Sequence, residues 1–273
     1  MSTGLSTGLS TGLSTGLSTG LKTDAKPPST PLRVAAIIPA RLNSSRFPGK
    51  LLANETGKSL LQHVWERAAL CKRIQEIIIA TDNELIRKTA LAFGARCVMT
   101  RSDHPNGTSR ICEAVADIDA EIIVNVQGDE PEIEPELISA AIAALEADDG
   151  ASLSTVVSPF LAHEDPANPN IVKCVVGMNN RALYFSRALI PCVRDLGHSR
   201  AEPRKHVGLY VYRREFLNVF ATLVPTPLEE TEQLEQLRAL EHGFSIAVAH
   251  GVARSHGIDT PEQYAAFVSR CKA

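Results

Sequence analysis

Short apolar segments alternate with helix-like segments in the first half of the chain, beginning near residue 34. A short apolar run is typical of a buried strand, and the apolar residues between these runs recur at the spacing of one helix face. Because parallel strands need long crossover connections, this alternation favours a parallel sheet covered by helices. The expected strands are residues 34–38, 76–80, 96–99 and 122–126.

Two apolar stripes between these strands predict helices. The first stripe comprises Leu60, Leu61, Val64, Trp65, Ala68 and Ala69, and the second comprises Leu85, Ile86, Ala90 and Phe93. Gly94 follows the second stripe, where glycine commonly ends a helix. A third helix is expected near residues 109–118, after a polar loop.

The second half of the chain predicts a mixed-sheet extension rather than an independent domain. Its expected strands are separated by proline-rich joints and lie at residues 152–157, 172–178, 207–212 and 245–249. We expect a helix at residues 228–242 and a terminal helix after Thr260. That last helix has good start chemistry, because Thr260 and Gln263 form a capping box with Pro261 at the first helical position.

Residues 2–21 are five copies of Ser-Thr-Gly-Leu. Such a repeat cannot build a core, and ordering its backbone costs much conformational entropy. We therefore expect residues 1–31 to be a disordered tail. Residues 32–273 are enough for one large α/β domain.

Composition limits the classes of function. The net charge of −3 argues against a general nucleic-acid or anionic-membrane surface. No apolar run approaches the roughly 20 residues that span a bilayer. The six cysteines show neither Cys-x-x-Cys nor Cys/His ligand spacing, which suggests free thiols in a reducing compartment. We expect a cytoplasmic protein without nucleic-acid or membrane partners.

A cationic loop follows the first expected strand. Arg41, Arg46 and Lys50 lie within ten residues, and Gly49 lets backbone amides approach a ligand closely. Fixed cations at the carboxyl end of a first strand suit a nucleoside triphosphate. The alternative is a solvated basic loop, but the two prolines and the glycine indicate a loop of defined conformation rather than a merely exposed one.

Two carboxylates are candidate metal ligands. Asp129 directly follows the strand at 122–126, so it points toward the same crevice as the cationic loop. The alternative is that Asp129 belongs to an ordinary turn. The location of Asp129 after a strand favours a magnesium ligand instead. Asp259 precedes the last helix, where helix capping alone could explain an acid. Thr260 already serves as the expected cap, which leaves Asp259 available for magnesium.

Together these motifs resemble the 3-deoxy-manno-octulosonate (Kdo) cytidylyltransferases, also called CMP-Kdo synthetases. The resemblance runs from about residue 34 to the last helix. It rests on the loop at residues 38–50 and on the runs Met-Thr-Arg-Ser-Asp-His (99–104), Val-Asn-Val-Gln-Gly-Asp-Glu-Pro (124–131), Ala-Leu-Tyr-Phe-Ser-Arg (182–187), His-Val-Gly-Leu-Tyr (206–210), Leu-Glu-Gln-Leu-Arg (234–238) and Gly-Ile-Asp-Thr-Pro (257–261). It implies a Rossmann-like nucleotidyltransferase fold with a mainly parallel central sheet, and a homodimer.

The resemblance also implies a reaction in which CTP and Kdo give CMP-Kdo and pyrophosphate, which activates Kdo for lipopolysaccharide synthesis. The anomeric hydroxyl of the sugar attacks the α-phosphorus in line. The implied catalytic residues are Arg41 and Lys50, which neutralise the triphosphate, and Asp129 and Asp259, which hold Mg²⁺. No separate general base is evident, and a metal-bound alkoxide would make one unnecessary.

Substrate-binding residues follow from the same resemblance. Residues 100–108 resemble the family's cytosine-reading segment, although Asn106 stands where the family more often has serine. The implied nucleotide-binding residues are Ala40, Arg41, Gly49, Lys50, Thr100, Arg101, Asn106, Gly107 and Asp129. The implied sugar-binding residues are Arg46, Gln127, Arg187, Tyr210, Glu235 and Gln236.

Alternatives remain open for the sugar and for the activity. Glu235 and Gln236 could be merely polar positions of the helix at 228–242. The sugar could be another α-keto acid, such as 8-amino-Kdo or a sialic acid, because one amino or hydroxyl group changes few pocket residues. The chain could also be a non-catalytic nucleotide-sugar-binding regulator. The presence of both Asp129 and Asp259 argues against that last alternative, since binding alone does not need two metal carboxylates.

Overall fold

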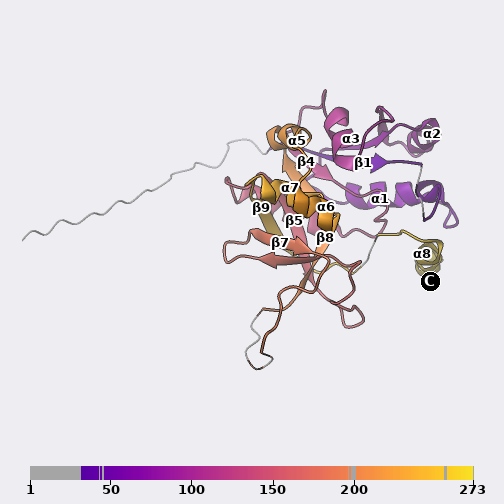
Figure 1. The fold of residues 1–273 in the computed structure, drawn as a ribbon. Coiled ribbons are helices and arrows are strands. Elements are labelled where there is room, and N and C mark those ends of the chain that lie inside the picture. Colours follow the sequence, from indigo (N-terminus) through magenta and orange to yellow (C-terminus); the bar gives the residue numbers. More distant parts are fainter. Residues whose placement is uncertain are drawn as a thin grey trace, which may run out of the picture. The chain divides into compact units, whose positions relative to one another are not determined.

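Nine strands of the described residues hydrogen-bond into one sheet (Figure 1). The structure is a computed structural model, and it describes residues 32–42, 44, 46–195, 197, 201–254 and 257–272. The expected disordered tail at residues 1–31 lies outside the described residues and stays a prediction.

The first half of the chain forms the parallel part of the sheet, as predicted. Strands β1 (Val34–Ala40), β2 (Glu76–Thr81), β3 (Arg96–Met99) and β4 (Ile122–Asn125) lie in the order β3-β2-β1-β4. β1 pairs in parallel with both β2 and β4. The carboxyl ends of these strands therefore meet at one edge, which is where ligands bind in open α/β sheets.

The second half extends the sheet with mixed strand directions, also as predicted. Strand β8 (Arg204–Arg213) runs antiparallel to both β4 and β5 (Leu153–Pro159), and β9 (Ile246–His250) runs parallel to β5. Strands β6 (Lys173–Val176) and β7 (Ala182–Ser186) form an antiparallel pair that meets β8 at one point. Consequently the extension shares a sheet with the parallel half.

Helices cover both faces of the sheet. Alternate residues of β1 point to opposite faces, and each set packs against a different group of helices. Ala36 and Ile38 pack in one core with helices α1 (Leu60–Ala69), α2 (Glu84–Ala92), α4 (Pro135–Glu146) and α8 (Pro261–Lys272). Ala35 and Ile37 pack in a second core with α3 (Gly107–Ala114), α5 (Arg214–Phe220) and α7 (Gln236–Glu241). Figure 1 shows α3 and α5 on the opposite side of β1 from α1.

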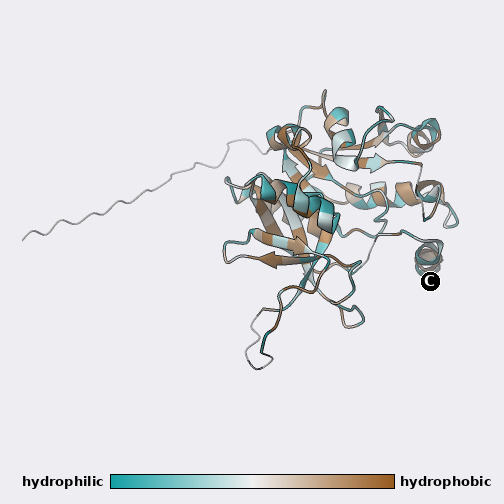
Figure 2. Ribbon diagram, in the orientation of Figure 1, coloured by the Kyte–Doolittle hydropathy of each residue, from teal (hydrophilic) through white to brown (hydrophobic). Residues whose placement is uncertain are grey.

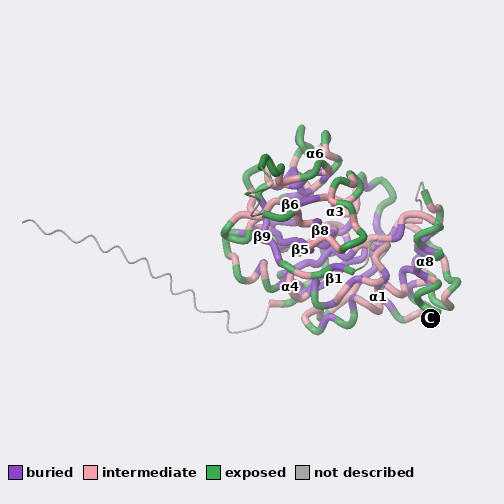
Figure 3. The backbone as a smooth tube through the Cα atoms, turned by 90° about the horizontal axis from the view of Figure 1, so that it is seen from below, coloured by how far each residue is buried: buried purple, intermediate pink, exposed green. Residues whose placement is uncertain are grey.

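Side-chain polarity follows this layering. The strands inside the fold are largely hydrophobic, whereas the helices alternate hydrophobic and hydrophilic residues (Figure 2). Buried residues follow β1, β5 and β8, and the short helix α6 (Pro227–Glu232) has no buried residue (Figure 3). Among the described residues, no helix is both long enough and apolar enough to cross a bilayer.

The structure corrects several expected elements. The single helix expected at residues 228–242 is two short helices, α6 and α7, because Gln233 adopts a left-handed backbone with φ of 54° that ends α6. Helix α3 begins at Gly107 rather than at residue 109, since the Asn106 side chain accepts the Ser109 N–H and caps it earlier. The elements α4, α5 and β7 were not predicted as such.

The buried position of Ile37 gives a stability prediction. Ile37→Ala should lower the free energy of unfolding by about 2–5 kcal/mol, because its fully buried side chain would leave a cavity between β1 and the helices of its face. The control is Leu85→Ala on α2, whose side chain is exposed and should cost no more than about 0.5 kcal/mol. Urea unfolding measures both, and equal losses would contradict the assigned core.

Candidate functional site

A cavity of about 410 Å³ lies at the carboxyl ends of β1 and β4. The loop after β1 supplies its cations, and the turn after β4 supplies its carboxylate. Within the described residues, its lining comprises Pro39, Arg41, Ser44, Arg46, Lys50, Leu51, Gly107, Gln127, Gly128 and Asp129. Six of the predicted site residues thus line one cavity: Arg41, Arg46, Lys50, Gly107, Gln127 and Asp129.

Lys50 is the centre of this cavity's hydrogen bonding. It begins a short 3₁₀ helix, η1 (Lys50–Leu52), and is largely buried. Its Nζ donates to Asp129 Oδ2 at 2.6 Å, to Asp259 Oδ1 at 3.0 Å and to the Ile258 carbonyl at 2.8 Å. The two carboxylates predicted as metal ligands therefore lie together, at the ends of chain segments far apart in sequence.

The arrangement of these two carboxylates fits a divalent cation. Asp129 and Asp259 keep part of their side chains exposed, and both already bind the single ammonium of Lys50. Carboxylate oxygens, completed by phosphate oxygens and water, are the ligands that Mg²⁺ prefers. Arg46 forms an ion pair of 2.8 Å with the second oxygen of Asp259. Two residues of the cationic loop, Arg46 and Lys50, therefore contact the same carboxylate.

Arg41 joins the cationic loop to the loop before α3. Its Nη2 donates to the backbone carbonyls of His104, at 2.7 Å, and Asn106, at 2.8 Å. Partial burial and the nearby Arg110 lower the pKa of Arg41, and Asp82 opposes that shift. Arg41 thus fixes the segment expected to read cytosine against the end of β1.

The segment expected to read the base rests on buried polar contacts. Arg110 is fully buried, and its guanidinium donates to Thr100 Oγ1 at 2.5 Å and to Asp82 at 3.1 Å. The exposed Arg101 donates its backbone N–H to Glu113 at 3.1 Å, and the His104 ring also bonds to Glu113. The Thr100 hydroxyl therefore already accepts a hydrogen bond from Arg110.

Two glycines permit the close approach of the loops. Gly49 adopts φ of 71°, which favours glycine, and its N–H donates to the Leu42 carbonyl. A Cβ on Gly128 would lie 3.1 Å from the Pro39 carbonyl, so glycine lets the turn after β4 pack against the end of β1. Ala40 is the buried last residue of β1 and holds the start of the cationic loop in place.

Glu130 is a neighbour of the candidate site that the sequence analysis did not single out, and it does not line the cavity itself. It follows Asp129 and lies under Gly208 and Gly257. Burial, followed by the charges of Asp129 and Glu134, raises the pKa of Glu130 to about 8. Its position inside the Gln-Gly-Asp-Glu-Pro run was visible in the sequence, but the burial that raises its pKa depends on distant segments.

The predicted sugar residues do not all lie in the cavity: Arg46 and Gln127 line it, whereas Arg187, Tyr210, Glu235 and Gln236 do not. Gln127 lines the cavity and donates to Asn125 at 3.4 Å. Tyr210 on β8 lies opposite Asn125 in the sheet, and burial raises the pKa of its phenol well above the usual value. Its ring makes tilted contacts with the rings of His206 and Tyr212, with centroids 5.4 Å and 6.2 Å away.

Glu235 and Gln236 stand at the start of α7. Glu235 Oε2 accepts a hydrogen bond of 2.7 Å from Thr108 at the start of α3. Glu235 Oε1 and Gln236 Nε2 are buried, and neither has a hydrogen-bond partner among the described residues. These two atoms are therefore candidates for contact with a ligand, which favours a binding role over mere polar positions on a helix.

Arg187 has a different environment from the other predicted sugar residues. Its guanidinium donates to the carbonyls of Glu232 at 2.7 Å, Pro169 at 3.2 Å and Gln233 at 3.4 Å. Its backbone N–H donates to the Glu232 carboxylate. These contacts hold the end of α6, so a sugar-binding role for Arg187 stays a prediction.

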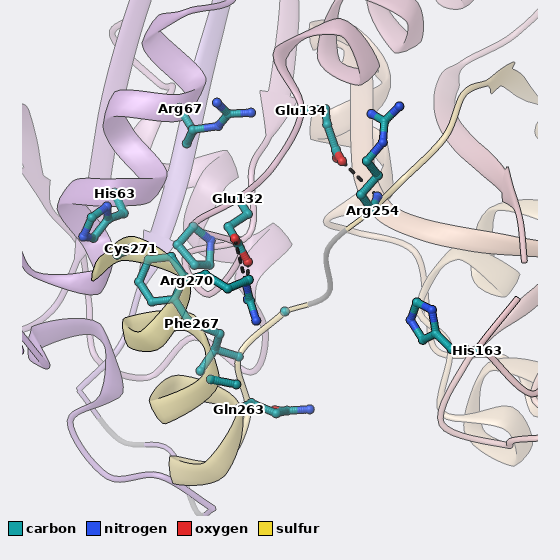
Figure 4. A pocket seen from close by; sticks show the side chains of 14 residues that line it. His63, Arg67, Glu132, Glu134, His163, Arg254, Gln263, Phe267, Arg270 and Cys271 are labelled. Carbon is teal, nitrogen blue, oxygen red and sulfur yellow. Dashed lines mark hydrogen bonds and ion pairs between the residues drawn. The ribbon is translucent and has the colours of Figure 1, made fainter. Parts of the chain in front are cut away.

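A larger cavity of about 810 Å³ lies beside α1 and α8, with Gly257 and Ile258 in its lining (Figure 4). The Arg270 side chain pairs with Glu132 there, and the Arg254 N–H donates to Glu134. None of the predicted site residues lines it. We therefore assign the candidate site to the smaller cavity, where the strand ends and the predicted residues meet.

The chain is similar to known proteins over most of its length. A family model described as Cytidylyltransferase matches residues 35–246. The chain is 48% identical over 239 residues to the 3-deoxy-manno-octulosonate cytidylyltransferase of Geobacter metallireducens, covering 84% of this chain and 94% of that protein. It is 45% identical over 250 residues to the Geobacter sulfurreducens protein of that name, covering 88% and 100%.

A solved structure shows the same fold. It is described as CMP:2-keto-3-deoxy-manno-octonic acid synthetase complexed with CTP, and it is 37% identical with a TM-score of 0.83. The likeness covers 88% of this chain and 98% of that one. This confirms the predicted α/β fold, with its mainly parallel sheet and mixed-strand extension.

The raised pKa of Glu130 gives a pH prediction. Between its ordinary value of 4.5 and its folded value of about 8, the folded protein holds a proton that the unfolded chain releases. The free energy of unfolding should therefore fall as pH rises through this window. Glu130→Gln should remove that fall, a relative gain of about 1–2 kcal/mol at pH 8 after discounting its partial exposure.

Urea unfolding in metal-free buffer at pH 5, 6.5 and 8 measures this difference. The exposed Glu136→Gln on α4 is the control for loss of one carboxylate. Parallel stability curves for the wild type and Glu130→Gln would contradict the shift.

Proposed function

This chain belongs to the cytidylyltransferase family, and on that premise we propose that it transfers CMP from CTP to Kdo and releases pyrophosphate. The observation that carries the proposal is the cavity at the ends of β1 and β4, where fixed cations lie beside two paired carboxylates. The names of the similar proteins support Kdo as the sugar and CTP as the nucleotide. The product would serve lipopolysaccharide synthesis.

The reaction exchanges one phosphorus–oxygen bond for another. The oxygen of the sugar's anomeric C2 hydroxyl forms a bond to the α-phosphorus of CTP, and its proton passes to the solvent. The bond from that phosphorus to the bridging oxygen breaks, and pyrophosphate leaves with the bonding electrons. Positioning and charge neutralisation supply most of the catalysis in such transfers.

Lys50 and Arg41 would neutralise the triphosphate. The Lys50 ammonium is positioned by its three acceptors, and it would exchange one of them for a phosphate oxygen of the triphosphate. Arg41 keeps its Nη2 on the loop before α3, which leaves its other N–H groups for phosphate oxygens. Gly107 then places the start of α3 at the same cavity.

Asp129 and Asp259 would hold the magnesium ion that we propose as the cofactor. When bound, such an ion would supply positive charge that neutralises the triphosphate and favours loss of the proton from the attacking hydroxyl. The two carboxylates support this assignment because they already share one cationic group, Lys50 Nζ. Arg46 is free to exchange its exposed pairing with Asp259 for the carboxylate of the sugar.

The cellular setting stays a proposal too. We propose a cytoplasmic homodimer. The six free cysteines suit a reducing compartment. The strongly exposed Met178 and Leu183, at the turn and on the second strand of the β6–β7 hairpin, support an apolar contact between subunits.

Pyrophosphate release tests the function directly. Purified protein with Mg²⁺ and CTP is compared with Kdo, 8-amino-Kdo and N-acetylneuraminate. Release with Kdo is the expected result. Release only with another sugar would replace the substrate, and CTP binding without release on any sugar would favour a non-catalytic regulator.

Removing either proposed metal ligand should abolish turnover without unfolding the protein. We expect Asp129→Asn and Asp259→Asn each to lower kcat at least about 100-fold, because a bound metal supplies several kcal/mol of charge stabilisation. The matched control is Asp149→Asn, whose side chain is 89% exposed. Circular dichroism monitors folding, and near-normal turnover by either site variant at ordinary magnesium would overturn the metal assignment.

Glu235 should act on the sugar rather than on the nucleotide. Glu235→Ala should raise the KM for Kdo about tenfold or more and the KM for CTP far less, because it removes an acceptor for sugar hydroxyls. Glu230→Ala, on the exposed side of α6, is the control. Equal changes in both KM values would remove Glu235 from the sugar site.

A further inference from the structure

Thr108 connects the two substrate regions of the site. It lies in the first turn of α3, immediately after Gly107, which lines the cavity at the strand ends. Its side chain is almost fully buried, and its hydroxyl donates to Glu235 Oε2 at 2.7 Å. A residue of the segment expected to read the nucleotide therefore holds a residue expected to bind the sugar.

The arrangement around Glu235 is incomplete in the protein alone. One carboxylate oxygen is bonded to Thr108, whereas Oε1 is buried without a partner among the residues that the structure describes. The neighbouring Gln236 Nε2 is buried and unpaired in the same sense. Leaving such groups unpaired costs free energy, so a buried acceptor and a buried donor on successive residues indicate a polar ligand.

We propose that Thr108 is a positioning residue for the sugar: its hydroxyl fixes the Glu235 carboxylate so that Oε1 accepts a hydrogen bond from a sugar hydroxyl. This inference rests on the proposed function and deepens it. Thr108 would thus act in sugar recognition, although it lies in the segment expected to read the nucleotide.

The charged and titratable neighbours of Glu235 explain why the Thr108 hydroxyl matters. Burial raises the pKa of the Glu235 carboxyl, and the charge of Glu229 raises it further. The Thr108 hydrogen bond and the charge of Arg238 lower it. Tyr212, from β8, is a hydrogen-bond partner of Thr108 and a neighbour of Glu235. Thr108 therefore helps to keep a buried carboxylate ionised, the form in which both of its oxygens act only as acceptors.

Substitution of Thr108 separates the hydroxyl from the side-chain volume. Thr108→Val keeps the shape and removes the donor, whereas Thr108→Ser keeps the donor. We expect Thr108→Val to raise the KM for Kdo about tenfold, since hydrogen bonds to charged groups are among the stronger ones, with a change of less than about threefold in the KM for CTP. Thr108→Ser should restore the Kdo KM to within about threefold of wild type.

The pH profile adds a readout that a purely structural role would not move. Without the Thr108 donor the pKa of Glu235 rises, so its carboxyl protonates at a higher pH. The increase of the Kdo KM on acidification should therefore begin at higher pH in Thr108→Val than in wild type. Thr222→Val, at an exposed threonine after α5, is the control for the substitution itself.

A double variant tests whether Thr108 acts through Glu235. In a Glu235→Ala background, Thr108→Val should raise the Kdo KM no further. Additive effects would overturn the inference, as would equal rises in both KM values or a Thr108→Ser variant as defective as Thr108→Val. Should Thr108→Val fail to fold, the smaller Thr108→Ala removes the same donor and faces the same criteria.

Wild-type activity distinguishes failure of the role inferred for Thr108 from failure of the proposed function. Wild-type protein that releases pyrophosphate with Kdo, together with an unchanged Thr108→Val variant, would overturn the inference alone. Wild-type protein that binds CTP but releases no pyrophosphate with Kdo would overturn the proposed function, and this inference with it.

Discussion

The ammonium of Lys50 holds together the parts of the chain that make the site. It bonds Asp129 after β4 and both Ile258 and Asp259 before α8, all from a loop that follows β1. The side chain is only 11% exposed, so its charge requires partners. Without it two carboxylates would face each other across a partly buried space. The convergence of the three segments therefore depends on this one cation.

Packing of α8 extends the same constraint. Phe47, in the cationic loop, contacts Tyr264 on α8 with ring centroids 5.6 Å apart. The Tyr264 hydroxyl accepts the Glu55 N–H at 3.0 Å, and His63 meets Phe267 edge to face. The segment that carries Lys50 thus also carries the contacts that place Asp259. The cationic loop and the second carboxylate form one unit although they lie at opposite ends of the domain's sequence.

The parts of the fold that sequence could predict are those that local pattern determines. Apolar runs located β1 to β4, and the rule that ligands gather at the carboxyl ends of parallel strands placed Asp129 beside the cationic loop. The helix expected at residues 228–242 was wrong because its apolar spacing carries no sign of the left-handed Gln233. The spacing could not reveal that glutamine, with a side chain, would adopt a conformation that glycine prefers.

Long-range contacts set the rest of the site, and no local pattern contains them. Thr108 and Glu235 are 127 residues apart, and only the packing of α3 near α7 brings their side chains together. The raised pKa of Glu130 likewise comes from burial under distant glycines. Resemblance supplied the candidate sugar residues, but it could not show that the Arg187 guanidinium donates to backbone carbonyls.

The proposed phosphate and sugar sides of the site differ in how well their polar groups are satisfied. On the phosphate side, the three N–H donors of Lys50 all have acceptors, so a triphosphate must exchange for an existing contact. On the sugar side, Glu235 Oε1 and Gln236 Nε2 are buried without partners among the described residues. A ligand with hydroxyls in the right places removes that cost, whereas an analogue without them leaves it in place. Under the proposed function, the fixed charges of the phosphate side do not distinguish one sugar from another, so discrimination between sugars would follow from the unsatisfied groups at the start of α7.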